Sequence, residues 1–233
     1  LATPGRLLDC LESGYFGLDR CNYYILDEAD RMTEDFEDEV ITILEMSKTQ
    51  DRLMMMFSAT MPPSVERLAT TYLNNPAYVY IGEQGLAVKN ITQNVEFVPT
   101  GYEAEQADNY KKKRLSKLLK EGPQPPVIVF ASTKVRCEML VKYLKSVGYS
   151  CTSLHSKKSQ QRRIEALDDF RDRVYDILVA TDVASRGVHV EGVNHVINFD
   201  MAKDIVVYTH RIGRTGRMGI KVDETTFLSN KYV

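Results

Sequence analysis

The chain has 233 residues, of which 43% are hydrophobic and 27% charged, a composition typical of one large globular domain or two small ones. Its formal net charge of −2 excludes a broadly basic surface, so any contact with RNA or DNA has to come from local groups. Four cysteines without a CxxC pair argue against a zinc site and favour a reducing intracellular compartment, and no apolar run reaches membrane length.

Apolar runs alternate with helix-like stretches along almost the whole chain. The predicted strands lie at 23–26, 53–57, 78–81, 93–98, 127–130, 151–154, 177–180, 195–198 and 225–228. The predicted helices lie at 5–13, 35–47, 63–74, 108–120, 133–147, 159–171 and 204–212. Strands that alternate with helices predict an α/β fold with buried parallel sheets covered by helices on both faces.

The composition changes in the middle of the chain, where GEQGLAVKN at 82–90 is polar and contains glycine. We expect a domain boundary near 83–90, with residues 1–84 in a first domain and 85–233 in a second. KKKR at 111–114 is expected to be the solvated face of a helix, with a targeting or RNA-binding patch as the alternative. Because the chain begins LATPGR without a methionine, we interpret it as a piece of a longer protein.

Three carboxylates follow the first predicted strand, in the segment YYILDEADRM at 23–32. Parallel α/β sheets bind ligands at the carboxyl ends of their strands. Acidic side chains there can hold Mg²⁺ through water and orient an attacking water against a phosphate. Taken alone, these residues fit a helix N-terminus about equally well, because the helix dipole favours acidic side chains there.

The segment HRIGRTGR at 210–217 places three arginines at every third position with glycines between them. Guanidinium groups bind phosphate oxygens in pairs, so the segment indicates a phosphate-binding element. A basic surface patch is the alternative, although a solvated patch has no need of the backbone freedom that glycine gives.

Seven motifs in one order resemble those of the DEAD-box RNA helicase family, over essentially the whole chain. They are TPGR (3–6), DEAD (27–30), SAT (58–60), VIVFAST (127–133), QQRR (160–163), ATDVASRG (180–187) and HRIGRTGR (210–217). The resemblance implies two RecA-like domains in an RNA-dependent ATPase that uses ATP and Mg²⁺ to unwind short RNA duplexes. No glycine-rich phosphate loop with a lysine is present, so we expect the first domain to be incomplete and this piece not to bind ATP properly.

The resemblance also implies a role for each motif residue. Asp27 would hold Mg²⁺ through water, Glu28 would activate the attacking water, and Arg214 and Arg217 would be the arginine fingers. The implied nucleotide-binding residues are Gly187, His189, Arg211, Arg214 and Arg217. The residues implied to couple the nucleotide to RNA are Asp30, Ser58, Thr60 and His210. The implied RNA-binding residues are Thr3, Gly5, Arg6, Thr133, His155, Gln160, Arg163 and Thr181.

Two positions depart from the family pattern. His189 stands where the family usually has an aspartate, and a protonated histidine there would repel the arginine fingers. Ser156 restricts the backbone at a position where the family usually has glycine. Two alternatives therefore remain: an ATP-gated RNA clamp with weak or no turnover, and a protein-interaction scaffold that has kept the fold.

Two segments look most like the spliceosomal branch of the family, which acts at the 5′ splice site. They are ATMPPSVERLATTYLNNPAYVYIG at 59–82 and FDMAKDI at 199–205. This likeness implies a nuclear protein that acts in pre-mRNA splicing with spliceosomal proteins and is monomeric on its own. Another RNA pathway, such as ribosome biogenesis, is the alternative.

Overall fold

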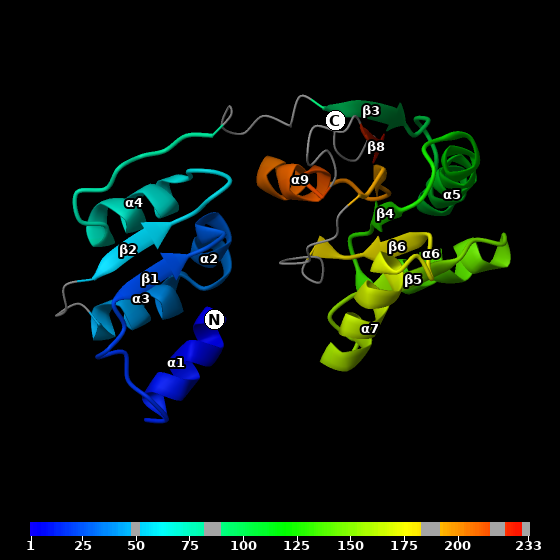
Figure 1. The fold of residues 1–233 in the computed structure, drawn as a ribbon. Helices are drawn as coiled ribbons and strands as arrows, with labels where there is room; N and C mark the ends of the chain where they lie inside the picture. The colour runs from blue at the N-terminus through cyan, green and yellow to red at the C-terminus, as the bar shows by residue number, and fades with distance from the viewer. Residues whose placement is uncertain (48–51, 82–89, 183–191, 215–221, 230–233) are drawn as a thin grey trace. The chain divides into compact units, whose positions relative to one another are not determined.

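The computed structural model describes residues 1–47, 52–81, 90–182, 192–214 and 222–229. The chain divides into two compact units, Leu1–Gly85 and Leu86–Val233, and each is described by itself (Figure 1). Both units are parallel α/β structures, which confirms the predicted fold class. No helix in these described ranges is both long enough and apolar enough to cross a membrane.

The first unit contains two parallel strands, β1 (Tyr23–Leu26) and β2 (Leu53–Met56), which pair residue for residue. Its helices are α1 (Pro4–Glu12), α2 (Ala29–Asp35), α3 (Glu37–Met46) and α4 (Pro63–Tyr72). Side chains of α1, α3 and α4 pack with alternate residues of both strands in one apolar cluster. The strand residues of this cluster are Tyr24, Leu26, Met54 and Met56.

The opposite face of this two-stranded sheet is open within the described residues, which corrects the prediction that 23–26 is buried on both faces. Tyr23 and Ile25 expose 65% and 57% of their surface, and Leu53 exposes 55%. Successive side chains of a strand point to opposite faces, so a helix layer on one side leaves every second residue uncovered. An apolar run shows that a strand can be buried, but not which neighbour covers it.

Two local features of the first unit differ from the sequence expectation. Residues 78–81 form no strand; together with β2 they line a cavity of about 880 Å³, and their backbone groups find no strand partner. The short helix α2 was not predicted, because it has seven mostly polar residues. Phe36, with φ −147° and ψ 32°, separates α2 from α3.

The second unit is built on a six-stranded parallel sheet with the order β3-β8-β7-β4-β6-β5. Its strands are β3 (Ile91–Phe97), β4 (Val127–Phe130), β5 (Cys151–Leu154), β6 (Ile177–Ala180), β7 (His195–Asn198) and β8 (Val222–Leu228). Its helices are α5 (Ala104–Glu121), α6 (Lys134–Ser146), α7 (Gln160–Arg171) and α9 (Ile205–Ile212). All strand pairs are parallel, so the carboxyl ends of the strands lie at one edge.

Helices cover both faces of the second sheet, as predicted. Helices α5 and α6 pack against Val127 and Val129 in one cluster. Helix α7 packs against Ile128 and Phe130 in a second cluster on the other face. Helix α9 lies on this second face as well, because the guanidinium of Arg211 stands over the Phe130 ring. All four residues of β4 are buried, which explains its uninterrupted apolar sequence.

The prediction of a solvated face for 111–114 is wrong for one of its four residues, Lys111. Lys111 exposes 6% of its surface and donates from Nζ to the carbonyl oxygen of Phe199 at 2.9 Å. Arg114 forms an ion pair with Glu96. Each helical residue is turned by about 100° from the one before it, so four consecutive cations cannot share one face.

Candidate functional site

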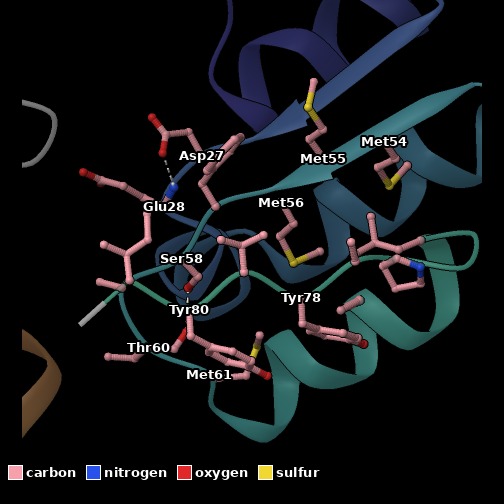
Figure 2. Close-up of a pocket in the computed structure, with 18 of the residues that line it drawn as sticks. Asp27, Glu28, Met54, Met55, Met56, Ser58, Thr60, Met61, Tyr78 and Tyr80 are labelled. Atoms are coloured by element: carbon pink, nitrogen blue, oxygen red, sulfur yellow. Dashed lines mark hydrogen bonds between the residues drawn. The ribbon is translucent and has the colours of Figure 1, made fainter. Parts of the chain in front are cut away.

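Asp27 and Glu28 lie at the end of β1, and both line the cavity of about 880 Å³ beside β2 (Figure 2). Asp27 is exposed, and its Oδ1 accepts a hydrogen bond from the backbone N–H of Glu28 at 3.0 Å. Mg²⁺ in proteins keeps several waters and is often held by one or two carboxylates and a substrate phosphate. The described residues contain no group of three ligating side chains. The pair therefore suits a hydrated Mg²⁺ ion and not a closed protein cage.

Glu28 has a strained backbone, with φ 53° and ψ 48° in the left-handed region that side chains other than glycine rarely adopt. Its carbonyl oxygen accepts from the backbone N–H groups of Arg31 and Met32, at 2.9 and 3.0 Å, and these bonds begin α2. Such a conformation costs about 1–3 kcal/mol and persists where the surroundings enforce it. The strain fixes the point from which the Glu28 carboxylate projects.

Hydrogen bonds join the DEAD segment to the SAT segment. Asp30 exposes 4% of its surface, and its Oδ2 accepts from the backbone N–H and the hydroxyl of Thr60 at 3.1 and 2.7 Å. The hydroxyl oxygen of Ser58 accepts from the backbone N–H of Asp30 at 3.2 Å, and the hydroxyl donates to the carbonyl of Thr60 at 2.6 Å. The ends of the adjacent strands β1 and β2 are thereby tied together.

The TPGR residues form the beginning of α1. Thr3 is the N-cap residue but its side chain makes no capping hydrogen bond, and Pro4 occupies the first turn. Arg6 is exposed and lies 3.9 Å from Asp9. A Cβ at Gly5 would meet nothing within 4 Å, so no neighbour requires glycine there. A helix N-terminus without a side-chain cap offers backbone N–H groups to an anion.

The predicted RNA-binding residues of the second unit lie at the carboxyl edge of three neighbouring strands. Thr133, His155 and Thr181 follow β4, β5 and β6, which are adjacent in the sheet. Gln160 and Arg163 lie in the first turn of α7, which comes after β5, and the Arg163 guanidinium donates to Gln160 Oε1 at 3.1 Å. The fold thus brings five residues from separate segments to one edge.

His155 is buried, unlike the exposed Thr133 and Gln160. Its Nδ1 accepts from the backbone N–H of Lys157 at 3.3 Å, so Nε2 carries the proton and donates to Glu138 Oε1 at 2.6 Å. The hydroxyl of Ser153 also donates to this oxygen, and with His155 it holds the pKa of Glu138 below its ordinary value. Both ring nitrogens are thus engaged within the protein, by a glutamate that the sequence did not reveal.

Arg211 is enclosed by the protein and exposes 3% of its surface. Its Nε and Nη2 donate to the two carboxylate oxygens of Asp182 at 2.6 and 2.9 Å. Its Nη1 donates to Asn198 Oδ1 and to the carbonyl of Asp200, at 3.0 and 2.7 Å. The side chain therefore fastens α9 to the ends of β6 and β7, which differs from the expected contact with a nucleotide.

The remaining motif residues lie at or beyond the end of α9. His210 and Arg214 are both half-buried, and the backbone N–H of Arg214 donates to the Arg211 carbonyl at 3.2 Å. Three of the expected nucleotide-binding residues lie outside the described ranges: Gly187, His189 and Arg217.

An ionic cluster that no motif indicated lies at the ends of β4 and β7. Arg136 donates to both carboxylate oxygens of Asp108, at 3.0 and 2.9 Å, and of Asp200, at 2.6 and 2.8 Å. Burial alone would raise the pKa of Asp200, but hydrogen bonds from Arg136 and from the backbone of Ser132 outweigh burial and lower it. No short spacing links these residues, since 64 positions separate Arg136 from Asp200.

Parallel α/β units that place carboxylates and arginines at their strand ends define a class of nucleotide-handling proteins. The DEAD/DEAH box helicase domain matches residues 1–68, and the helicase conserved C-terminal domain matches residues 110–219. The chain belongs to the DEAD-box RNA helicase family, which confirms the resemblance seen in the motifs.

Three relatives illustrate this membership. ATP-dependent RNA helicase ddx23 of Dictyostelium discoideum is 45% identical, over 100% of this chain and 30% of that protein. Pre-mRNA-splicing ATP-dependent RNA helicase prp-28 of Neurospora crassa is 44% identical, over 98% of this chain and 34% of that protein. The crystal structure of the RNA helicase Prp28 from Chaetomium thermophilum bound to ADP has a TM-score of 0.55 and 42% identity, covering 99% of this chain and 53% of that one. The chain spans about a third of the curated relatives it matches.

Proposed function

We propose that this chain is part of an RNA-dependent ATPase that unwinds short RNA duplexes or remodels RNA–protein complexes. The joined ends of β1 and β2 carry the proposal. Two carboxylates that line the cavity, Asp27 and Glu28, stand three and two residues before a third, Asp30, which is hydrogen-bonded to Thr60. Groups that handle phosphate thus share one short segment with a group that ties the two strands.

Each motif residue near the phosphate has a proposed task. Asp27 holds the hydrated Mg²⁺ ion, which supplies positive charge to the phosphates when it is bound. Glu28 orients and polarises the attacking water. Arg214 and Arg217 stabilise charge on the γ-phosphate, a contribution of about 10³ to 10⁵ in turnover. Gly187 and His189 are assigned to nucleotide contacts as well.

Arg211 receives a different task from the one its motif implies. All three of its guanidinium nitrogens donate to Asp182, Asn198 and the Asp200 carbonyl. A guanidinium that is engaged in this way positions α9 and does not contact phosphate. Arg214, the next arginine of the motif, then acts from the end of the helix that Arg211 fixes.

RNA is assigned to the start of α1 and to the carboxyl edge of the second sheet. The assigned residues are Thr3, Gly5, Arg6, Thr133, His155, Gln160, Arg163 and Thr181. Contacts with phosphates and 2′-hydroxyls suit a protein with a net charge of −2, because a few placed donors replace a broad basic field. The coupling residues are Asp30, Ser58, Thr60 and His210.

We assign residues 1–84 to the first domain and 85–233 to the second. The proposed pathway is pre-mRNA splicing in the nucleus, with spliceosomal proteins as partners. Support for the pathway comes from relatives at 41–46% identity, several of which are named as pre-mRNA-splicing helicases. The protein is proposed to be monomeric on its own.

ATP hydrolysis by the full-length protein, with and without single-stranded RNA, tests the proposal. Glu28→Gln is expected to reduce RNA-stimulated turnover by about 10²- to 10⁴-fold. The matched control is Glu66→Gln on α4, the same substitution at an exposed residue that does not line the cavity. Absent turnover with RNA held tightly beside an ATP analogue would favour the clamp. RNA binding that ignores ATP analogues would favour the scaffold.

A further inference from the structure

A fully buried carboxyl group lies beneath α9, and the proposed function does not use it. Glu224 in β8 exposes 0% of its surface. In the parallel ladder it lies opposite Gln93 of β3 and Val196 of β7. Its carboxyl group contacts Tyr208 of α9, so it points to the face of the sheet that this helix covers. A carboxyl group without access to water is costly to bury and requires hydrogen-bond partners.

One carboxyl oxygen of Glu224 is linked to Arg211. Oε1 accepts from Asn198 Nδ2 at 2.9 Å and also from the hydroxyl of Thr226. The other end of the Asn198 amide, Oδ1, accepts from Arg211 Nη1 at 3.0 Å. Asn198 thus bridges the carboxyl group to the arginine that fastens α9 to the sheet.

The second carboxyl oxygen of Glu224 reaches the preceding turn of the same helix. Oε2 lies 3.1 Å from the hydroxyl of Tyr208, and that hydroxyl lies 2.7 Å from Gln93 Oε1. Tyr208 and Arg211 are three positions apart on α9. The hydrogen-bond chain therefore begins and ends on α9 and passes through Glu224 in the sheet.

A count of protons gives the charge state that satisfies this network. The Tyr208 hydroxyl has one proton, and the carbonyl oxygen of Gln93 can only accept. When Tyr208 donates to Gln93, its contact with Glu224 is a hydrogen bond only if Oε2 of Glu224 carries a proton. Burial acts in the same direction, because it raises the pKa of Glu224 against the opposing hydrogen bonds. The titratable or charged groups that face the carboxyl from α9 are Tyr208 and, through Asn198, Arg211.

We propose that Glu224 is a positioning residue, whose carboxyl group holds α9 on the sheet through Tyr208 and Asn198 and so fixes Arg214. The backbone after α9 carries the effect: the N–H of Gly213 donates to the Thr209 carbonyl at 2.9 Å, and the N–H of Arg214 donates to the helix as well. The inference rests on the proposed function, because that function assigns Arg214 to the γ-phosphate.

Three variants of the full-length protein test the role. Glu224→Gln keeps a neutral group that can accept from Asn198 and donate to Tyr208. Glu224→Leu keeps similar bulk but removes both hydrogen bonds. Thr225→Val is the matched structural control. It removes the Thr225 hydroxyl, which lies 2.9 Å from His195 Nε2. Thr225 is next to Glu224 in β8, so its side chain points to the face of the sheet opposite α9.

Two readouts are compared: amide hydrogen exchange in residues 205–212, and kcat and KM for ATP with saturating RNA. For Glu224→Leu we expect exchange to accelerate at least about tenfold and kcat/KM to fall by about 10- to 100-fold, because a small displacement of a phosphate-binding group is costly. Glu224→Gln and Thr225→Val are expected to stay within about twofold of the parent in both readouts.

Unchanged exchange in α9 of Glu224→Leu, beside an active parent, would overturn the positioning role and leave the proposed function intact. An equal defect in Glu224→Gln and Glu224→Leu would contradict the inference that the Glu224 carboxyl group is neutral and donates to Tyr208. If the parent shows no ATP hydrolysis, the proposed function fails, and the exchange of α9 still decides the role of Glu224. Accelerated exchange in Thr225→Val as well would reduce the effect to general destabilisation and count against the proposal.

Discussion

Asp30 and Thr60 are joined twice, because one carboxylate oxygen of Asp30 accepts both the backbone N–H and the hydroxyl of Thr60. Thr60→Val removes the hydroxyl bond and keeps the size of the side chain. A hydrogen bond to a charged group contributes about 1.5–3 kcal/mol, so we expect RNA unwinding to fall about tenfold or more. RNA-stimulated ATP hydrolysis should fall less, since Asp27 and Glu28 keep their places. Thr60→Ser is the control and should behave as the parent in both assays.

The left-handed backbone of Glu28 predicts a conflict between stability and activity. Glycine adopts φ 53° without steric cost, so Glu28→Gly should stabilise the junction of β1 and α2 by about 1 kcal/mol. Amide exchange in residues 23–35 should then slow about fivefold while ATP hydrolysis is lost. Glu28→Gln separates the two effects, because it should lose hydrolysis without slowing exchange. Faster exchange in Glu28→Gly would contradict stored strain at this residue.

Most elements of the fold could be predicted, because the apolar runs are short and the helices between them are regular. The strands 127–130, 151–154, 177–180 and 195–198 agree with the structure to the residue. The failure at 78–81 has a physical cause: an apolar, β-branched and aromatic segment forms a strand only where a neighbour pairs with its backbone. The exposed side of β1 has a similar cause. The hydrophobic pattern shows which residues share a face of the strand, but it does not show whether another element covers that face.

The candidate site was predictable where a motif is local and was not where contacts join distant segments. Asp30 and Thr60 belong to two motifs, and the parallel pairing of β1 and β2 brings the motifs together as strand ends. Arg211 is an example of the second case. Its motif indicated a contact with phosphate, but its guanidinium donates to Asp182, which is 29 positions away. Glu224 stands in no motif, and its burial depends on how α9 lies on the sheet.

The different surroundings of Arg211 and Arg214 predict different defects for the same substitution. Arg211→Lys cannot reproduce the paired bonds to Asp182 and leaves a partly buried carboxylate with a poorer partner. We expect a loss of about 2–4 kcal/mol in unfolding free energy, measured by urea denaturation followed by circular dichroism. Arg214→Lys should change unfolding by less than about 1 kcal/mol yet lower ATP turnover about 10³-fold. Equal stability losses in the two variants would contradict a structural role for Arg211.

The four cysteines should divide into two reactive and two protected thiols. Burial raises the pKa of Cys137 to about 12 and also raises the pKa of Cys151, and both are fully buried. Cys10 and Cys21 are partly exposed and form no disulfide. Because the thiolate is the reacting species, iodoacetamide at about pH 8 should label Cys137 and Cys151 only after unfolding. Peptide mass spectrometry reads the label, and modification of Cys137 in the native protein would contradict its burial.

His195 predicts a loss of stability in acid. It exposes 2% of its surface, its Nε2 lies 2.9 Å from the Thr225 hydroxyl, and its Nδ1 has no hydrogen-bond partner among the described residues. Burial lowers its pKa from 6.5 to about 4. Between these values the unfolded chain binds a proton that the folded chain does not. His195 therefore contributes no penalty near pH 7 and opposes folding progressively as the pH falls toward 4.

The contribution of His195 must be separated from groups that titrate in the same range. Burial raises the pKa of Glu224, which acts with the opposite sign, because the folded chain then keeps a proton that the unfolded chain releases. Asp200, whose pKa is lowered, acts in the same direction as His195. These terms cancel when the parent is compared with His195→Gln by urea denaturation of residues 86–233. From about pH 7 to pH 4 the parent should lose about 3 kcal/mol more than the variant. Parallel pH profiles would mean that protonated His195 is accommodated in the folded sheet, which its unpartnered Nδ1 argues against.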